Sequence, residues 1–263
     1  MDNNNTLKRT FDEVARLYNE ARPLYPDELF VNLIAATGLQ PGSTLLEIGP
    51  GTGQATTPLA RKGFDITAVE LGAGLAEVAR NELQDYKNVQ IIVGAFEAVT
   101  LPERSFDLVF AATSFHWIEP SVRFVKIHNL LKDGGHLAVI HTHHTSDEKG
   151  DAFFNASQPI YDKYDFTDKH KKPEFPQHKD LKPTDLDESL FRLKYFQSFP
   201  VVIRYSANKF VQLLNTYSNH LVASQPVQQA FYGEIEALIN DRFQGTVDKH
   251  FSMSLTIAEK IDD

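Results

Sequence analysis

The chain has 263 residues, 42% of them hydrophobic, so it can bury a sizeable core as one large α/β domain or as one domain with an insertion. Its 26 basic and 35 acidic residues give a formal net charge of -9, which argues against binding to nucleic acid phosphates or to anionic lipid. The absence of cysteine excludes disulfides and thiolate chemistry, and without a signal-peptide core or an apolar run of about 18 residues we expect a cytoplasmic protein.

Residues 1–38 are predicted to form a helical lid in front of the first strand. Apolar residues recur at helical spacing from Phe11 to Tyr18, and the prolines of residues 22–26 then interrupt the pattern. A second helix should start at Asp27, whose side chain can cap it, and should end at Gly38.

Strands and helices alternate at short intervals over residues 40–142, which predicts right-handed crossovers and a parallel sheet. The first apolar run, residues 43–48, passes directly into a glycine-rich loop at residues 49–53. Because glycine has no Cβ, such a loop lets the backbone approach a bound nucleoside closely. A second run, residues 64–69, ends in Glu70, whose carboxylate is placed to accept hydrogen bonds from ribose hydroxyls.

The spacing of the glycines separates two classes of cofactor. A dinucleotide fingerprint needs a third small residue at the position that Gln54 occupies. Residues 47–53 instead read E-x-G-x-G-x-G, which resembles the first motif of the class I S-adenosylmethionine-dependent methyltransferases. The resemblance implies that the loop passes beneath the methionine part of S-adenosylmethionine and that Glu70 holds its ribose.

The resemblance continues to residue 142. Residues 88–94 are similar to the third strand of the family, residues 105–112 to the fourth, and residues 131–140 to the turn and fifth strand. The turn carries Asp133 where the family pattern has proline.

One departure concerns the adenine. Many family members have an acid directly after the glycine of the third strand, and this chain has Ala95 there, followed by Phe96 and Glu97. We expect Phe96 to pack against the adenine, with backbone amides or Glu97 making the polar contacts.

The N-terminal stretch 18–26 resembles a Y-x-x-x-R-P-x-Y-P segment found in a subgroup of these methyltransferases. In relatives this piece closes over cofactor and acceptor, and Arg22 would supply a cation near the cofactor carboxylate. The resemblance thus implies the following cofactor-binding residues: Tyr18, Arg22, Glu47, Gly49, Gly51, Gly53, Gln54, Glu70, Leu71, Ala95, Phe96, Glu97 and Ala112.

Residues 114–118 follow the fourth strand, where the methyl acceptor should lie. His116 is the predicted catalytic residue, since it could act as the base for a hydroxyl or carbon acid. The alternative is that His116 is a structural hydrogen bonder, and that Phe115 and Trp117 are core, which we favour for Trp117.

Three histidines, His141, His143 and His144, end the fifth strand. No neighbouring residue completes a motif with known ligand spacing, so we expect a polar rim and no metal. Tyr205 and Lys209 match the Tyr-x-x-x-Lys pair of short-chain dehydrogenases, but so short a pattern arises easily by chance.

The rest of the chain completes the sheet. Residues 145–187, rich in Lys, Asp, His and Pro, are predicted to form a partly helical cap at the carboxyl edge. Residues 190–263 should supply a strand at 192–204, helices at 207–221 and 226–243, and an antiparallel strand at 249–258. We therefore predict a single domain over residues 1–263: a doubly wound, seven-stranded, mostly parallel Rossmann-like sheet with an antiparallel last strand and an inserted cap.

The predicted function is direct in-line transfer of a methyl group from S-adenosylmethionine to a small-molecule acceptor, by a monomer or a homodimer that binds neither nucleic acid nor membrane. Two alternatives remain open. A nicotinamide-dependent oxidoreductase would use Tyr205 and Lys209, and a non-catalytic regulatory protein would bind S-adenosylmethionine without an acceptor cavity.

Overall fold

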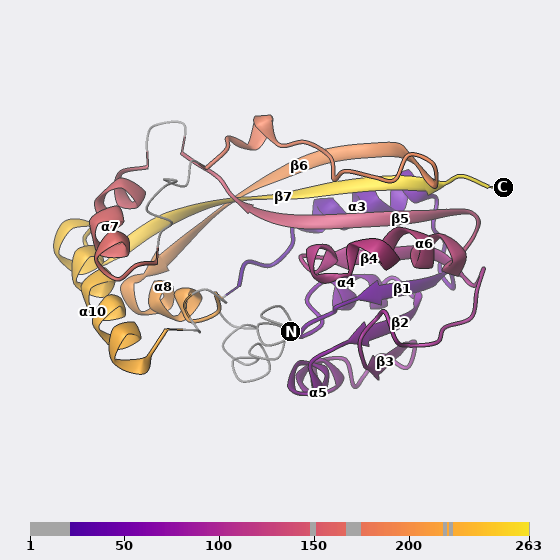
Figure 1. Ribbon diagram of the computed structural model, residues 1–263, viewed down its shortest axis with the longest axis horizontal. Helices are drawn as coiled ribbons and strands as arrows, with labels where there is room; N and C mark the ends of the chain where they lie inside the picture. The colour runs from indigo at the N-terminus through magenta and orange to yellow at the C-terminus, as the bar shows by residue number, and fades with distance from the viewer. Residues whose placement is uncertain (1–21, 148–150, 167–174, 218–219, 221–222, 263) are drawn as a thin grey trace.

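The computed structural model describes residues 22–147, 151–166, 175–217, 220 and 223–262 (Figure 1). Its centre is one seven-stranded sheet with the strand order β3-β2-β1-β4-β5-β7-β6. The pairs among the first five strands are parallel, and β7 is antiparallel to both of its neighbours. The predicted fold class, a doubly wound and mostly parallel sheet with an antiparallel last strand, is confirmed.

The strands lie close to their predicted positions, and the last three are much longer than the first four. Their bounds are β1 (Thr44–Ile48), β2 (Asp65–Glu70), β3 (Val89–Val93), β4 (Phe106–Ala112), β5 (Leu131–His144), β6 (Phe191–Ser206) and β7 (Thr246–Lys260).

Helices connect the strands and cover the sheet. Their bounds are α3 (Asp27–Thr37), α4 (Thr56–Ala60), α5 (Ala73–Glu82), the 3-10 turn η1 (Phe115–Trp117), α6 (Pro120–Leu130), α7 (Ala152–Lys163), the 3-10 turn η2 (His178–Asp180), α8 (Ala207–Leu214) and α10 (Gln225–Arg242). Among the described helices, none has the length and apolar character that crossing a membrane requires.

Helix α3 ends as predicted and begins differently. Gly38 has a φ of 69° and closes the helix, with its amide donating to the Ile34 carbonyl. The prediction that Asp27 caps the helix is wrong: Pro26 occupies the cap position in extended conformation, and no side chain there makes a capping hydrogen bond. Asp27 is the first helical residue, where its charge complements the helix dipole.

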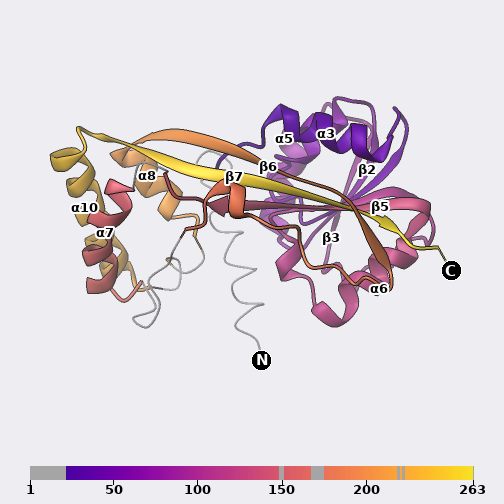
Figure 2. The same cartoon turned by 90° about the horizontal axis from the view of Figure 1, so that it is seen from above.

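Helices lie on both sides of the central strands (Figure 2), and each side has its own buried core. Alternate residues of one strand enter different cores, because successive side chains of a strand point to opposite faces. Leu45 packs with Leu33 of α3 in one core, and Leu46 packs with Ile127 of α6 in the other. This arrangement leaves the carboxyl ends of β1, β2 and β4 as the open edge at which a ligand can approach.

Strands β5, β6 and β7 extend past this region and carry a second group of helices (Figure 1). We call α7, α8, α10 and the adjoining ends of β6 and β7 the helical lobe. In α10, Phe231, Ile235 and Ile239 recur every four residues and are fully buried in a third core. The helix predicted over 207–221 is shorter than expected, since α8 ends at Leu214.

Phe231 is expected to be the most sensitive position of this third core. Its ring lies 4.6 Å from Phe166 and 4.9 Å from Tyr161, measured between centroids, and it is fully buried. Phe231→Ala should lower the free energy of unfolding by about 3–5 kcal/mol, because it leaves a cavity. Urea unfolding followed by circular dichroism measures the loss, with the exposed Val202→Ala as control. Equal losses in the two variants would contradict a tightly packed lobe.

Candidate functional site

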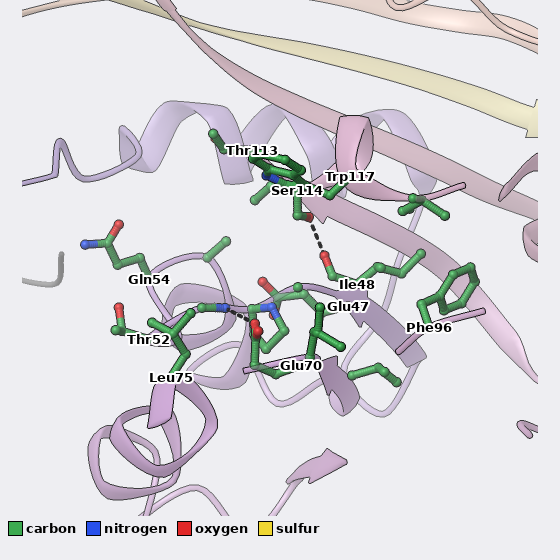
Figure 3. A pocket seen from close by; sticks show the side chains of 18 of the residues that line it. Glu47, Ile48, Thr52, Gln54, Glu70, Leu75, Phe96, Thr113, Ser114 and Trp117 are labelled. Carbon is green, nitrogen blue, oxygen red and sulfur yellow. Dashed lines mark hydrogen bonds between the residues drawn. The ribbon is translucent and has the colours of Figure 1, made fainter. Parts of the chain in front are cut away.

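One pocket opens at the carboxyl ends of β1, β2 and β4, the position that this topology favours for ligands (Figure 3). The structure brings most of the predicted site residues together here. Those that line the pocket are Arg22, Glu47, Gly49, Gly51, Gln54, Glu70, Leu71, Ala95, Phe96, Glu97, Ala112 and His116. Gly53 does not line it, and Tyr18 lies outside the described residues.

The glycine loop approaches the end of β4 so closely that its first glycine has no space for a side chain. Gly49 has a φ of 68°, and a Cβ there would lie 2.7 Å from the Cβ of Ser114. Ser114 in turn donates a hydrogen bond to the Ile48 carbonyl (Figure 3). Ser114 was expected only at the start of an acceptor segment, because its contact with the loop has no local signal in the sequence.

The third glycine has a different role from the first. Gly53 has a φ of 90°, and a Cβ there would lie 3.0 Å from Cδ1 of Leu83. It therefore allows a tight turn next to the residue that follows α5, rather than facing the pocket.

Glu70 stabilises the loop directly. One carboxylate oxygen accepts from the Gly51 amide at 2.9 Å (Figure 3). The other accepts from the Gly72 amide at 2.8 Å. An ionised carboxylate has about four acceptor positions, so one such group can accept both from loop amides and from a ligand hydroxyl.

Glu47 is fully buried beneath the loop. Its Oε2 accepts from the Thr56 hydroxyl at 2.6 Å, and its Oε1 has no hydrogen-bond partner in the described part of the chain. Burial, opposed by the Thr56 hydrogen bond and assisted by the charge of Glu70, raises the pKa of Glu47 to about 8. Oε1 thus offers a polar contact to any ligand or water that reaches it.

The segment after β3 forms another wall. Phe96 is buried, and Lys126 Nζ lies 5.0 Å from the centroid of its ring. The same ammonium donates to the Phe96 carbonyl at 2.7 Å, while Glu97 accepts from the Glu119 amide at 2.9 Å. These contacts hold the backbone of the segment in place.

His116 and Trp117 form the wall on the β4 side, with ring centroids 4.8 Å apart. Trp117, which we expected in the core, is half-buried and lines the pocket. His116 is partly exposed, and desolvation by the surrounding protein lowers the pKa of its imidazole.

Two of the three predicted rim histidines, His141 and His143, form a row of neighbouring rings with His116. The His116 and His141 centroids are 6.3 Å apart, those of His141 and His143 are 5.8 Å apart, and His143 Nε2 lies 2.8 Å from the Ser254 hydroxyl. Burial, with smaller contributions from the neighbouring imidazoles, lowers the pKa of His141 to about 4. Within the described ranges, no group of three or more His, Asp or Glu residues could hold a metal ion.

Arg22 and Tyr25 enter from the N-terminal side. Arg22 donates from Nε to the Thr216 hydroxyl at 2.9 Å and from Nη2 to the Thr216 carbonyl at 3.0 Å. Its guanidinium lies 4.8 Å from the centroid of the Tyr217 ring. Arg22 thereby connects the pocket with the segment after α8, in the helical lobe.

Thr113, directly after β4, was not predicted as a site residue. It is β-branched and yet has a φ of 58°, a left-handed conformation that costs roughly 1–3 kcal/mol. Its hydroxyl lies 2.9 Å from the Tyr25 hydroxyl and 3.2 Å from the Thr142 hydroxyl. The strained backbone therefore presents a row of three hydroxyl groups beside the pocket.

Tyr205 and Lys209, the pair typical of dehydrogenases, lie elsewhere. Tyr205 lies near the end of β6 as a buried member of the third core, and Lys209 belongs to α8. Neither residue lines the pocket.

Comparison with known proteins gives a consistent result. Residues 46–139 match a family model described as a methyltransferase domain. An uncharacterized methyltransferase of Mycobacterium tuberculosis is 29% identical over 143 residues, which cover 54% of this chain and 55% of that protein. An uncharacterized methyltransferase of Schizosaccharomyces pombe is 32% identical over 135 residues, 51% of this chain and 53% of that protein. The chain spans about half the length of these curated relatives.

A solved structure extends the similarity to nearly the whole chain. It is a phosphoethanolamine N-methyltransferase of Haemonchus contortus in complex with S-adenosylhomocysteine. The match has a TM-score of 0.53 at 16% identity and covers 97% of this chain and 59% of that one. At this identity, the likeness concerns the fold alone.

Proposed function

We propose that this chain is a class I S-adenosylmethionine-dependent methyltransferase, which binds S-adenosylmethionine in the pocket and transfers its methyl group to a small-molecule acceptor. The observation that carries the proposal is the joining of the glycine loop to Glu70, through the Gly51 amide, inside a pocket at the strand ends. A ligand in this pocket would therefore contact loop backbone that carries no side chain, next to a carboxylate that could bind its ribose.

The residues present fit this cofactor. Gly49 offers bare backbone, the Glu70 carboxylate beside the loop would accept from the ribose hydroxyls, and Oε1 of Glu47 is a buried polar atom without a partner among the described residues. Phe96 would pack against the adenine, and backbone amides beside Ala95 would complete its recognition. Arg22 lies on the pocket wall, where its positive charge would attract the methionine carboxylate.

The cofactor supplies a methyl group on a sulfonium sulfur, which is already a good leaving group. The contribution of the protein is therefore mainly to position the acceptor in line with the methyl group and to exclude water. A carboxylate acceptor needs no base. A hydroxyl or carbon acid would lose a proton, and His116, neutral because its pKa is lowered, is the best-placed residue of the pocket to accept it.

The two alternative functions are less well supported. An oxidoreductase would need Tyr205 and Lys209 near its cofactor, yet neither lines the pocket, and Gln54 occupies the third small position of the dinucleotide motif. A regulatory protein without catalysis would not need the polar wall that His116 and Thr113 form beside the cofactor site.

Calorimetric titration separates these functions. We expect S-adenosylhomocysteine to bind and NAD not to bind at comparable concentrations. A screen of small acceptors with methyl-labelled S-adenosylmethionine then tests transfer. Binding of NAD in preference to S-adenosylhomocysteine would refute the proposal.

The role of Glu70 can be tested separately. Glu70→Ala should weaken S-adenosylhomocysteine binding by roughly 1.5–3 kcal/mol, about 10–150-fold, because it removes hydrogen bonds to a charged group. Isothermal calorimetry measures the affinity, and Glu82→Ala, an exposed acid at the end of α5, is the control. Unchanged affinity in Glu70→Ala would remove this carboxylate from the ribose site.

A further inference from the structure

Lys249 of β7 places its ammonium among aromatic rings. Its Nζ lies 4.5 Å from the centroid of Phe175 and 5.9 Å from that of Phe251. In the part of the chain that the structure describes, this ammonium has neither a hydrogen bond nor a salt bridge, and Asp151 is the carboxylate whose charge acts on it. Burial lowers the pKa of Lys249 to about 8, so the group is still mostly charged at pH 7.

His144 lies next to this ammonium on the paired strand β5. Its ring centroid is 5.3 Å from Phe251 and 5.5 Å from Tyr217. Its Nδ1 is buried and has no hydrogen-bond partner among the described residues. Burial and, to a lesser degree, the charges of Lys249, Arg22 and His143 together lower the pKa of His144 to about 3, so both cations act on this one imidazole.

Of these side chains, Arg22 lines the cofactor pocket, and Tyr217 lies between it and His144: the ring centroid of Tyr217 is 4.8 Å from the Arg22 guanidinium and 5.5 Å from the His144 centroid. A cation removed from water is stabilised when an anion binds beside it, and two cations near one site strengthen that attraction. The positive charge here contrasts with the net charge of -9 on the whole chain. Aromatic rings around the cations exclude water, which strengthens the electrostatic interaction.

We propose that the methyl acceptor is an organic anion, a carboxylate or a phosphate ester, whose charged group binds beside Lys249 and His144, with Arg22 on the side of the cofactor pocket. This inference rests on the proposed methyl transfer. The Nδ1 of His144, with its proton, donates to the anion, and the rings of Phe175, Phe251 and Tyr217 pack against the carbon part of the acceptor.

The test compares acids with their uncharged amides on the full chain saturated with S-adenosylhomocysteine. Calorimetry at pH 7 measures binding of phenylacetate against phenylacetamide and of glutarate against glutaramide, and phenyl phosphate distinguishes a phosphate site from a carboxylate site. We expect the anions to bind roughly tenfold or more tightly than the amides. Lys249→Met should remove this preference, Lys249→Arg should keep it, and the exposed Lys62→Met is the control.

Equal binding of acids and amides by the wild-type chain, or a preference that persists in Lys249→Met, would overturn the inference. Binding of S-adenosylhomocysteine is measured first for every variant. If the wild-type chain does not bind it, the proposed function itself fails. If it binds while the acids show no preference, only the anionic acceptor is wrong. Thermal unfolding of Lys249→Met and Lys249→Arg confirms that both variants are folded.

Discussion

Gly51→Val is expected to reduce the affinity for S-adenosylhomocysteine by roughly 100-fold or more while the chain remains folded. Gly51 has a φ of 59°, lines the pocket, and donates its amide to Glu70. A β-branched residue is strained in this conformation, so the loop would shift and its amide would leave Glu70. The two methyl groups of valine would also occupy the space in which the loop backbone must contact the cofactor directly. Isothermal calorimetry measures the affinity.

Gly134→Val is the matched control. Gly134 has a similar φ of 69° in the turn of β5, and a Cβ there would meet nothing within 4 Å. The substitution Gly134→Val therefore introduces the same backbone strain at a position away from the pocket. Both variants should lose stability to a similar degree in thermal unfolding, and only Gly51→Val should lose binding. Normal binding by Gly51→Val would show that the loop is not the cofactor site.

Glu47→Gln is expected to change how the stability of the ligand-free protein depends on pH. In the unfolded chain the carboxyl group of Glu47 has a pKa near 4.5, whereas in the folded chain burial raises this pKa to about 8. Between these values unfolding releases a proton, so the free energy of unfolding falls as the pH rises, by about 1.4 kcal/mol per unit. This stabilising contribution is complete below pH 4.5 and is lost as the pH passes 8.

Glutamine has nearly the same shape and no charge, so the variant should lack this decline. We expect the difference in unfolding free energy between variant and wild type to grow by roughly 4 kcal/mol from pH 5 to pH 8, in favour of the variant. Urea unfolding at several pH values measures it. Taking the difference cancels the titration of the histidines, and the exposed Glu103→Gln should show no such change. Parallel pH curves for wild type and Glu47→Gln would mean that Glu47 is ionised in the folded protein.

The fold class followed from local patterns because each pattern has a local physical cause. The apolar run before Gly49 predicts β1, since a strand covered on both faces is apolar throughout. The glycine spacing predicts the turn, because only glycine readily adopts the positive φ found at Gly49, Gly51 and Gly53. The start of α3 did not follow from its local pattern. Pro26 holds the cap position expected of Asp27, because an extended φ and ψ are enough to start a helix without a side-chain hydrogen bond.

Other features depend on pairs of residues that are far apart in the sequence. Ser114 excludes a side chain at Gly49, and Arg22 binds Thr216, which is 194 positions away. Neither contact has a sequence signal, because each depends on which strands become neighbours and how the helical lobe is placed. The strain at Thr113 likewise arises where β4 ends against Tyr25 and Thr142.

By itself, the sequence determined the alternation of strands and helices in the core, the glycine loop and the acid that ends β2, because these depend on hydrophobic periodicity and on backbone conformations within a few residues. Only the tertiary structure decided that Glu47 is buried with a raised pKa, that Gly53 faces Leu83 instead of the pocket, and that Lys249 and His144 lie together. Burial and electrostatic potential are sums over every neighbour in space, and the packing of the whole chain sets those neighbours.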